Sequence, residues 1–241
     1  MKKFINLVLF SFVFVGLLPI AHAEDMWKRE LSLGFTQATG NTQNSQLSGA
    51  VEADKKTESD QVTLKASTLY SSQHKKMDGQ KHEASVRYAL NFSENQWYAF
   101  YKFSIDHDKF SNIDYRMLPT AGIGYWFSDT DDWKAMAELG LGLEHINYSD
   151  ETKDRTDAII VPRAFFEKTV FEKAKLSQDI AAYPNLEESD DFRVIAETRF
   201  TNPLSDNMSL RFSFVDEFNS NPAGEAKKND TRTVLALIYS F

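Results

Sequence analysis

The chain has 241 residues and no Cys, and its formal net charge at pH 7 is −8. An acidic chain repels the phosphate backbone, so we exclude nucleic acid as a partner. The lack of Cys excludes disulfides, thiolate metal sites and lipoprotein acylation.

Residues 1–23 have the pattern of a cleavable secretory signal peptide. Lys2 and Lys3 give a basic start, an apolar run follows, and Ala21-His22-Ala23 provides a small-residue cleavage site. A retained anchor would need about 20 apolar residues and usually lacks such an ending. Removal of the two lysines leaves 25 of the 27 basic residues against 35 acidic ones. The remaining domain is then 24–241.

No later apolar stretch is long enough for a transmembrane helix, so a chain that crosses a bilayer here must cross it as a β-barrel. A strand that spans an outer membrane needs about 9–11 residues with alternating lipid-facing and lumen-facing side chains. The sequence offers twelve such segments, and their uncharged lipid-facing positions fall within 31–35, 47–51, 62–70, 84–92, 97–103, 121–127, 133–143, 160–166, 176–182, 194–200, 208–214 and 233–241. We therefore predict an all-β fold, a single antiparallel transmembrane barrel.

Charged residues occupy the intervening positions, which we expect to face the lumen. A Lys or Arg on the lipid face near the midplane costs about 2–4 kcal/mol, so a membrane barrel must keep that face uncharged. Aromatic residues also gather at strand ends, where interfacial girdles belong. The candidate lumen charges are Lys65, Arg87, Lys102, Glu138, Arg163, Asp179, Arg193, Glu197, Arg199 and Arg211, together with Glu30 and Glu52.

The strand number is predicted as twelve, with ten as the alternative. Pro162 removes a ladder donor from its strand, and the segment near Leu176 is only weakly apolar. Short periplasmic turns and longer extracellular loops are expected to alternate. The longer loops are predicted at 74–81, 106–115, 145–157 and 216–230.

The last strand ends with Leu237, Tyr239 and Phe241 at every second position. This ending resembles the signal by which bacterial outer-membrane barrels are recognised for assembly. We accordingly predict export to the outer membrane, with periplasmic chaperones, the barrel-assembly machinery and outer-membrane lipids as partners.

The segment Gly34 to Thr42 is similar to the opening of the YdiY-like salt-induced outer membrane protein family, a domain family of unknown function. Thr39-Gly40-Asn41-Thr42 carries most of the resemblance, with Gly40, Asn41 and Thr42 as the family motif. The resemblance implies an outer-membrane barrel linked to salt or acid stress, and it implies no catalytic residues. From the residues themselves, Gly40-Asn41 favours a tight loop, and a ligand-binding loop is the alternative.

Two histidines are weighed as sites of chemistry. His145 could serve as the base of an outer-membrane lipid hydrolase if a Ser hydroxyl lay within about 3 Å of its ring. His107, between Asp106 and Asp108, could bind a divalent cation, but ligand identity alone is weak evidence. We therefore predict no catalytic residue, no metal and no cofactor.

The charged lumen indicates more about function than the two histidines do. A barrel of eight strands fills with side chains and one of sixteen leaves an aqueous channel, so twelve strands allow either a plugged interior or a narrow pore. Gly122, Gly124, Gly140 and Gly142 are expected to leave free space there. The function is interpreted as that of a stress-responsive envelope component or a narrow channel for small solutes or ions. The alternatives are a lipid hydrolase and a soluble, lipocalin-like periplasmic protein.

Overall fold

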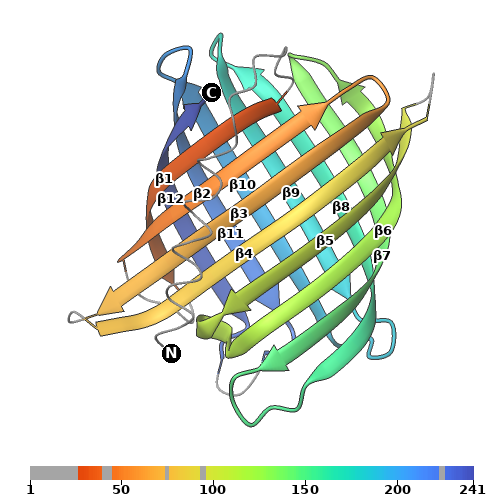
Figure 1. The fold of residues 1–241 in the computed structure, drawn as a ribbon, viewed down its shortest axis with the longest axis vertical. Coiled ribbons are helices and arrows are strands. Elements are labelled where there is room, and N and C mark those ends of the chain that lie inside the picture. Colours follow the sequence, from red (N-terminus) through yellow and green to blue (C-terminus); the bar gives the residue numbers. More distant parts are fainter. Residues whose placement is uncertain (1–26, 40–44, 74–75, 93–95, 223–225) are drawn as a thin grey trace.

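In a computed structural model the chain forms a closed antiparallel β-barrel, described for residues 27–39, 45–73, 76–92, 96–222 and 226–241. Twelve strands in these residues follow one another around the barrel in chain order, and β1 pairs with β12 to close it (Figure 1). The prediction of twelve strands is confirmed. The expected signal peptide at 1–23 and the family motif at 40–42 lie outside the described residues.

The strands are β1 (Trp27–Thr39), β2 (Ser45–Lys56), β3 (Asp60–Gln73), β4 (Lys76–Asn91), β5 (Trp97–Asp108), β6 (Ile113–Asp129), β7 (Trp133–Tyr148), β8 (Arg155–Val170), β9 (Ala174–Pro184), β10 (Phe192–Pro203), β11 (Met208–Asn219) and β12 (Asn229–Ser240), with a short 3₁₀ turn, η1 (Lys109–Ser111), between β5 and β6. Pro162 lies in β8 and Leu176 in β9, so both doubtful strands form. Within the described residues, no helix is long and apolar enough to cross a membrane.

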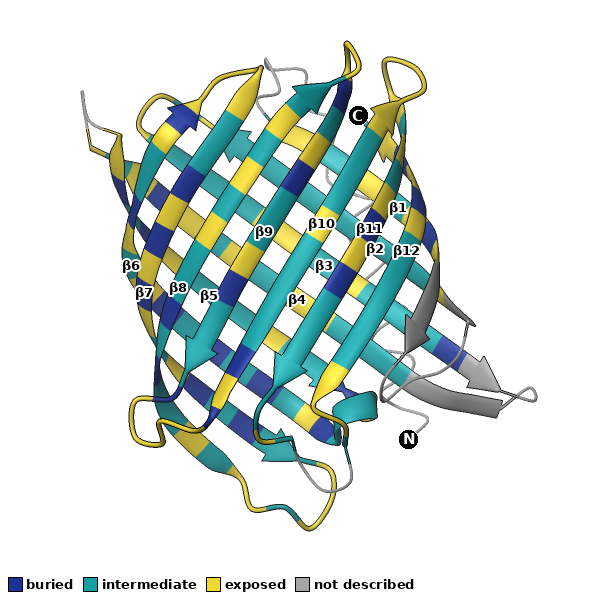
Figure 2. Ribbon diagram, turned by 180° about the vertical axis from the view of Figure 1, so that it is seen from behind, coloured by how far each residue is buried: buried dark blue, intermediate teal, exposed yellow. Residues whose placement is uncertain are grey.

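Side chains alternate between the outer surface and the interior along the strands. On β7, Leu139 and Leu141 are 52% and 62% exposed, whereas Glu138 between neighbouring outward residues is 7% exposed. Exposed and buried segments alternate in the same way along other strands (Figure 2). Large apolar residues outside and charges inside are the reverse of a soluble lipocalin-like barrel, so that alternative is wrong.

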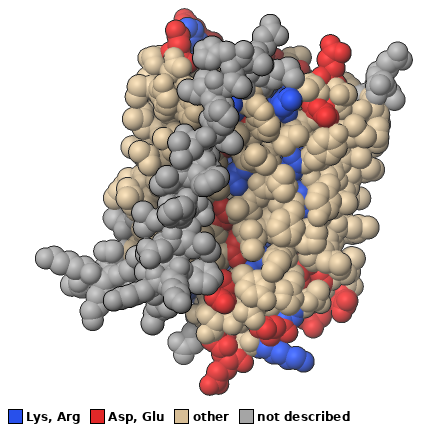
Figure 3. Space-filling view, viewed as in Figure 1, with Lys and Arg blue, Asp and Glu red and all other residues tan. Residues whose placement is uncertain are grey.

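Aromatic residues ring one end of the outer surface. We call this the turn end, because Phe241 and the even-numbered connections lie there. Trp97 packs edge-on against Tyr125, and Tyr239 stacks with Phe241. Charged atoms gather near the two ends of the surface, and the band between them is mostly uncharged (Figure 3). Such a girdle beside an apolar band matches a membrane interface.

The opposite end, which carries the odd-numbered connections, is called the loop end. Its connections are shorter than predicted, because the strands continue into the expected loops. β3 runs to Gln73 and β4 begins at Lys76, and between β5 and β6 only 109–112 lie outside the strands. The predicted loops at 74–81 and 106–115 are therefore largely strand.

Candidate functional site in the barrel interior

Glu138 of β7 is the centre of an interior network that we call the central network. Its carboxylate accepts hydrogen bonds from Arg87 at 2.5 Å, Arg163 at 3.0 Å and the Tyr98 hydroxyl at 2.9 Å. Arg163 also binds Asp179 through two hydrogen bonds of 2.9 and 2.6 Å. Arg87 is on β4, three strands away from β7 in the barrel order, so this contact crosses the interior.

The remaining candidate lumen charges also lie on the inner face, most of them in pairs. Lys65 contacts Glu52 at 2.9 Å, Arg199 contacts Glu197 at 2.5 Å, Arg211 contacts Glu30 at 3.3 Å and Arg193 contacts Glu144 at 2.8 Å. Among the described residues, Lys102 alone of these candidates has no ion pair or hydrogen bond through its side chain. Every candidate arginine thus has a carboxylate partner that offsets its charge.

A second network crosses the lumen near the loop end, and we call it the loop-end network. Lys81 of β4 lies 2.9 Å from Asp108 and 3.4 Å from Glu217 of β11. Arg232 joins Glu217 at 3.7 Å. Because β4 and β11 are almost opposite in the barrel order, the Lys81–Glu217 contact spans the lumen.

Arg116 continues the loop-end network on the other side. It binds Asp106 through two hydrogen bonds of 2.9 Å, and its Nε lies 4.0 Å from Glu144, which holds Arg193. The side chains of Arg116, Glu144 and Arg193 are each only 9% exposed. Charges buried to this extent need such partners, since an unpaired one would be costly.

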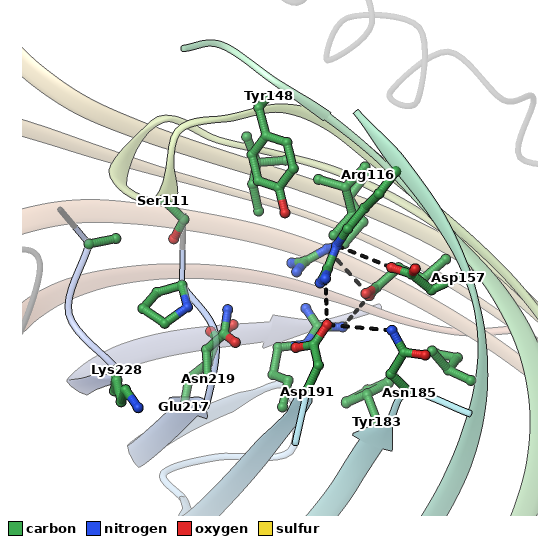
Figure 4. Close-up of a pocket in the computed structure, with 18 of the residues that line it drawn as sticks. Ser111, Arg116, Tyr148, Asp157, Tyr183, Asn185, Asp191, Glu217, Asn219 and Lys228 are labelled. Carbon is green, nitrogen blue, oxygen red and sulfur yellow. Dashed lines mark hydrogen bonds and ion pairs between the residues drawn. The ribbon is translucent and has the colours of Figure 1, made fainter. Parts of the chain in front are cut away.

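A pocket lies beside the loop-end network (Figure 4). Arg155 bridges Asp157, at 3.1 Å, and Asp191, and Asn185 also reaches Asp191. The pocket has a cavity volume of about 50 Å³, which suits small polar groups. Nε of Arg193, in its lining, is buried and has no hydrogen-bond partner.

The interior has two unlike sides. Along β5, β6 and β8 it is closely packed, with buried apolar side chains among the ion pairs, such as Tyr98 and Ile159 at 2% exposure each. Along β3 and β4 it is polar and open, since the Lys65 side chain is 46% exposed and Glu83 is exposed as well. Any continuous path for solvent therefore lies against the polar side.

The four glycines do not leave the free space that we predicted. Tyr98 faces Gly124 across the β5–β6 ladder, and Phe100 faces Gly122. A Cβ on Gly124 would lie 2.2 Å from the Tyr98 ring, and one on Gly122 would lie 2.9 Å from the Phe100 ring. Aromatic rings thus fill the room beside Gly122 and Gly124, and the side chains of Thr120 and Leu118 fill it beside Gly140 and Gly142.

The two histidine hypotheses gain no support from the geometry. Nδ1 of His145 lies 2.7 Å from the Thr156 hydroxyl, whereas a hydrolase site required a Ser in that position. Asp106 and Asp108, the carboxylates beside His107, bind Arg116 and Lys81. Within the described residues, no group of three metal-ligating side chains is assembled.

Sequence reasoning missed the loop-end network because most of its residues fell in or beside segments predicted as loops. The alternation that placed Arg87 inside continues to Lys81 at the same parity, and Arg116 shares the parity of Leu118 and Thr120. Extending each strand until its alternation failed would have found them. The contacts Lys81–Glu217 and Arg193–Glu144 could not be found in this way, because they join strands that are not neighbours in the barrel.

The closed barrel, the uncharged outer band and the charged interior together define an integral outer-membrane β-barrel protein. The chain belongs to the family described as protein of unknown function DUF481, whose model matches residues 31–241. The resemblance noted to a salt-induced outer membrane protein family is consistent with this membership. A search of curated proteins finds no match.

Solved structures with similar folds include outer-membrane porins and channels. The NanC porin matches with a TM-score of 0.60 at 8% identity, covering 88% of this chain and 100% of that one. An outer membrane channel from Pseudomonas putida F1 matches with a TM-score of 0.54 at 9% identity, covering 92% and 100%. The KdgM porin matches with a TM-score of 0.50 at 10% identity, covering 87% and 99%. At these identities the likeness concerns the fold.

Proposed function

We propose that the protein is a narrow, passive outer-membrane channel for small polar solutes or ions, and that it acts without catalysis. The observation that carries the proposal is the polar, open side of the lumen, where Lys65 and Glu83 are exposed inside a closed barrel. The porin and channel folds of the similar structures agree with it.

The constriction of this channel is the loop-end network. Lys81 and Glu217 meet across the lumen, and the carboxylates on either side hold the neighbouring basic groups in place. Charged groups at a constriction select among ions by their sign and number. Since the lumen arginines are paired, we assign the ion preference to the residues that lack or expose their partners, namely Lys102, Lys65 and Glu83.

The proposal is tested by single-channel conductance of the refolded protein in a planar bilayer, with heat-modifiable gel mobility as evidence of folding. We expect small discrete steps for the unaltered protein. The double variant Lys81→Met/Glu217→Gln should give steps about twofold larger, because it removes the charge contact that spans the lumen.

The matched control is Lys168→Met/Asp132→Asn, which removes an exposed ion pair at the turn end, away from the residues assigned to the channel. This pair does not span the lumen, so the step size should stay near that of the unaltered protein. Folded protein without conductance steps in all three forms would overturn the channel proposal. Equal enlargement by both double variants would overturn the assignment of the constriction.

We also propose the route by which the protein reaches the membrane. The basic and apolar pattern of residues 1–23 supports export by a cleaved signal peptide. Leu237, Tyr239 and Phe241 all face outward at the turn end, which keeps them accessible to assembly factors. Periplasmic chaperones and the barrel-assembly machinery are the partners that this route requires.

A further inference from the structure

The barrel wall between β8 and β9 is interrupted. Their pairing runs from Val170↔Ala174 to Arg163↔Ala181 and stops at Pro162, so that it covers only half of the 16 residues of β8. Beyond Pro162 the same register returns as a single bridge between Ile159 and Asn185. The opposite edge of β8 is paired with β7 from Trp133↔Lys168 to Ile146↔Arg155. The interruption therefore affects only the edge of β8 that adjoins β9.

Two prolines explain the interruption. Leu186 N donates to Ala158 O at 2.8 Å, which identifies one facing pair that exchanges hydrogen bonds. Such pairs alternate along an antiparallel ladder, so the next two are Ile160 with Pro184 and Pro162 with Ala182. Proline has no N–H, and two of the four hydrogen bonds of these pairs therefore have no donor. We call residues 159–162 and 182–185 the β8–β9 seam.

An apolar cluster lies directly inside the seam. Leu118, Ile159 and Val161 are 7%, 2% and 9% exposed, and Tyr183 packs against them. Apolar side chains on an inner wall are unusual, because the interior of a membrane barrel is generally polar. This cluster therefore offers hydrocarbon a surface on the inner side of the wall, at the place where the wall lacks hydrogen bonds.

The pocket of Figure 4 continues from this cluster toward the loop end. Ile159, Tyr183 and Asn185 line both the seam and the pocket, and Arg193 lies in the same lining with its guanidinium over the Tyr183 ring. Arg193 is 8% exposed, and its Nε is a buried donor without an acceptor. A buried guanidinium N–H is best satisfied by an anionic oxygen.

We propose that the β8–β9 seam is a lateral entry for the acyl chain of a fatty acid, whose carboxylate binds Arg193. The acyl chain would lie against the apolar cluster, and the carboxylate would lie in the pocket that Arg193 lines. Backbone carbonyls without a donor are costly in hydrocarbon, so the seam is the part of the wall that separates most easily. This site is independent of whether the lumen conducts.

Amide hydrogen exchange of the full barrel in lipid nanodiscs tests the proposal, with palmitate as the probe. Peptides covering 158–162 and 182–186 should exchange about tenfold faster than those of the β7–β8 ladder, because local opening costs less there. Palmitate should slow the exchange of the seam severalfold. Hexadecyltrimethylammonium, which has an equally long chain and a cationic head, should not.

Three variants separate the parts of the proposal. Pro162→Ala/Pro184→Ala restores both donors and should abolish the fast exchange and the effect of palmitate. Pro119→Ala is the matched control, because Pro119 lies in a gap of the β6–β7 ladder that has no second proline. It should leave both observations unchanged. Arg193→Gln should weaken the palmitate effect and keep the fast exchange.

Seam amides that exchange as slowly as those of the β7–β8 ladder would overturn the lateral entry. Equal protection of the unaltered protein and of Pro162→Ala/Pro184→Ala by palmitate would do the same. Protection by the cationic amphiphile as strong as that by palmitate would overturn the assignment of the carboxylate to Arg193.

Discussion

At the scale of single residues, Tyr98 connects the shape of the backbone to the charges of the lumen. Its ring covers Gly124, its hydroxyl donates to Glu138, and the guanidinium of Arg87 lies 5.6 Å from its ring centroid. Phe100 repeats the arrangement with Gly122 and lies 5.2 Å from the same guanidinium. The central network therefore rests on two aromatic rings, which in turn require glycine on the facing strand.

This dependence predicts that Gly124→Ala destabilises the barrel. The new Cβ would lie 2.2 Å from the Tyr98 ring, so either the ring or the strand must move. Overpacking of this kind costs about 1–3 kcal/mol. Urea unfolding of the refolded protein, followed by tryptophan fluorescence, measures the loss of free energy of unfolding.

Gly49→Ala is the control for this change, since a Cβ there would have its nearest neighbour, the Thr68 Cγ2, at 3.7 Å. Its effect should stay within about 0.5 kcal/mol. Similar unfolding midpoints for both variants would contradict this prediction, because they would show that the Tyr98 ring moves aside at little cost.

The sequence predicts which residues face the lumen but not what they contact. Parity alone placed Arg87, Glu138 and Arg163 inside. Arg87 and Glu138 are 51 positions apart in the chain and lie on strands that are not paired, so no local pattern records their contact. For the same reason the four glycines were predicted to leave free space, because the sequence around a glycine does not show how large the side chain facing it on the next strand is.

At the scale of the strand, the uncharged outer face is the feature that holds each element in the bilayer. Leu139 lies near the middle of β7 and is 52% exposed on this face. Leu139→Arg should lower the free energy of unfolding in lipid vesicles by about 2–4 kcal/mol, because it places a charge near the membrane midplane. Denaturant titration in vesicles measures the difference.

Met208→Arg provides the comparison, because Met208 is the first residue of β11 at the turn end. Close to the interface, the same charge should cost only about 0–1 kcal/mol. Equal costs at the two positions would contradict the depth at which we place these strands.

The strands were predictable because the lipid face tolerates no charge over its whole length. Their loop ends were not, because there the outer face leaves the hydrocarbon and polar residues return to both faces. His82, on the outer face of β4, is bonded to the Thr68 hydroxyl, and His107 is stacked on it. A polar residue on the outer face predicts a loop, although the β-ladder continues through this position.

At the scale of the whole molecule, closure between β1 and β12 leaves Phe241 on the outer surface. Phe241 N donates to Arg29 O, and the Phe241 residue is 60% exposed. Its side chain therefore contributes little to the finished barrel. Phe241→Ala should reduce the amount of protein found in the outer membrane severalfold in cells, while the refolded barrel keeps its unfolding midpoint.

Leu235→Ala is the matched control, since Leu235 lies on the same face of β12 and is 48% exposed. Its membrane yield should match that of the unaltered protein, as measured by quantitative blotting of membrane fractions. Equal yields for both variants would argue against an assembly role for the last residue.

The Lys81–Glu217 contact also bears on the order of events in folding. The two residues are 136 positions apart, and they are brought into register only when the two edges of the sheet have met. An interaction that forms after the rate-limiting step leaves the folding rate unchanged and slows unfolding. We therefore expect the ion pair that spans the lumen to prolong the lifetime of the closed barrel without speeding its formation.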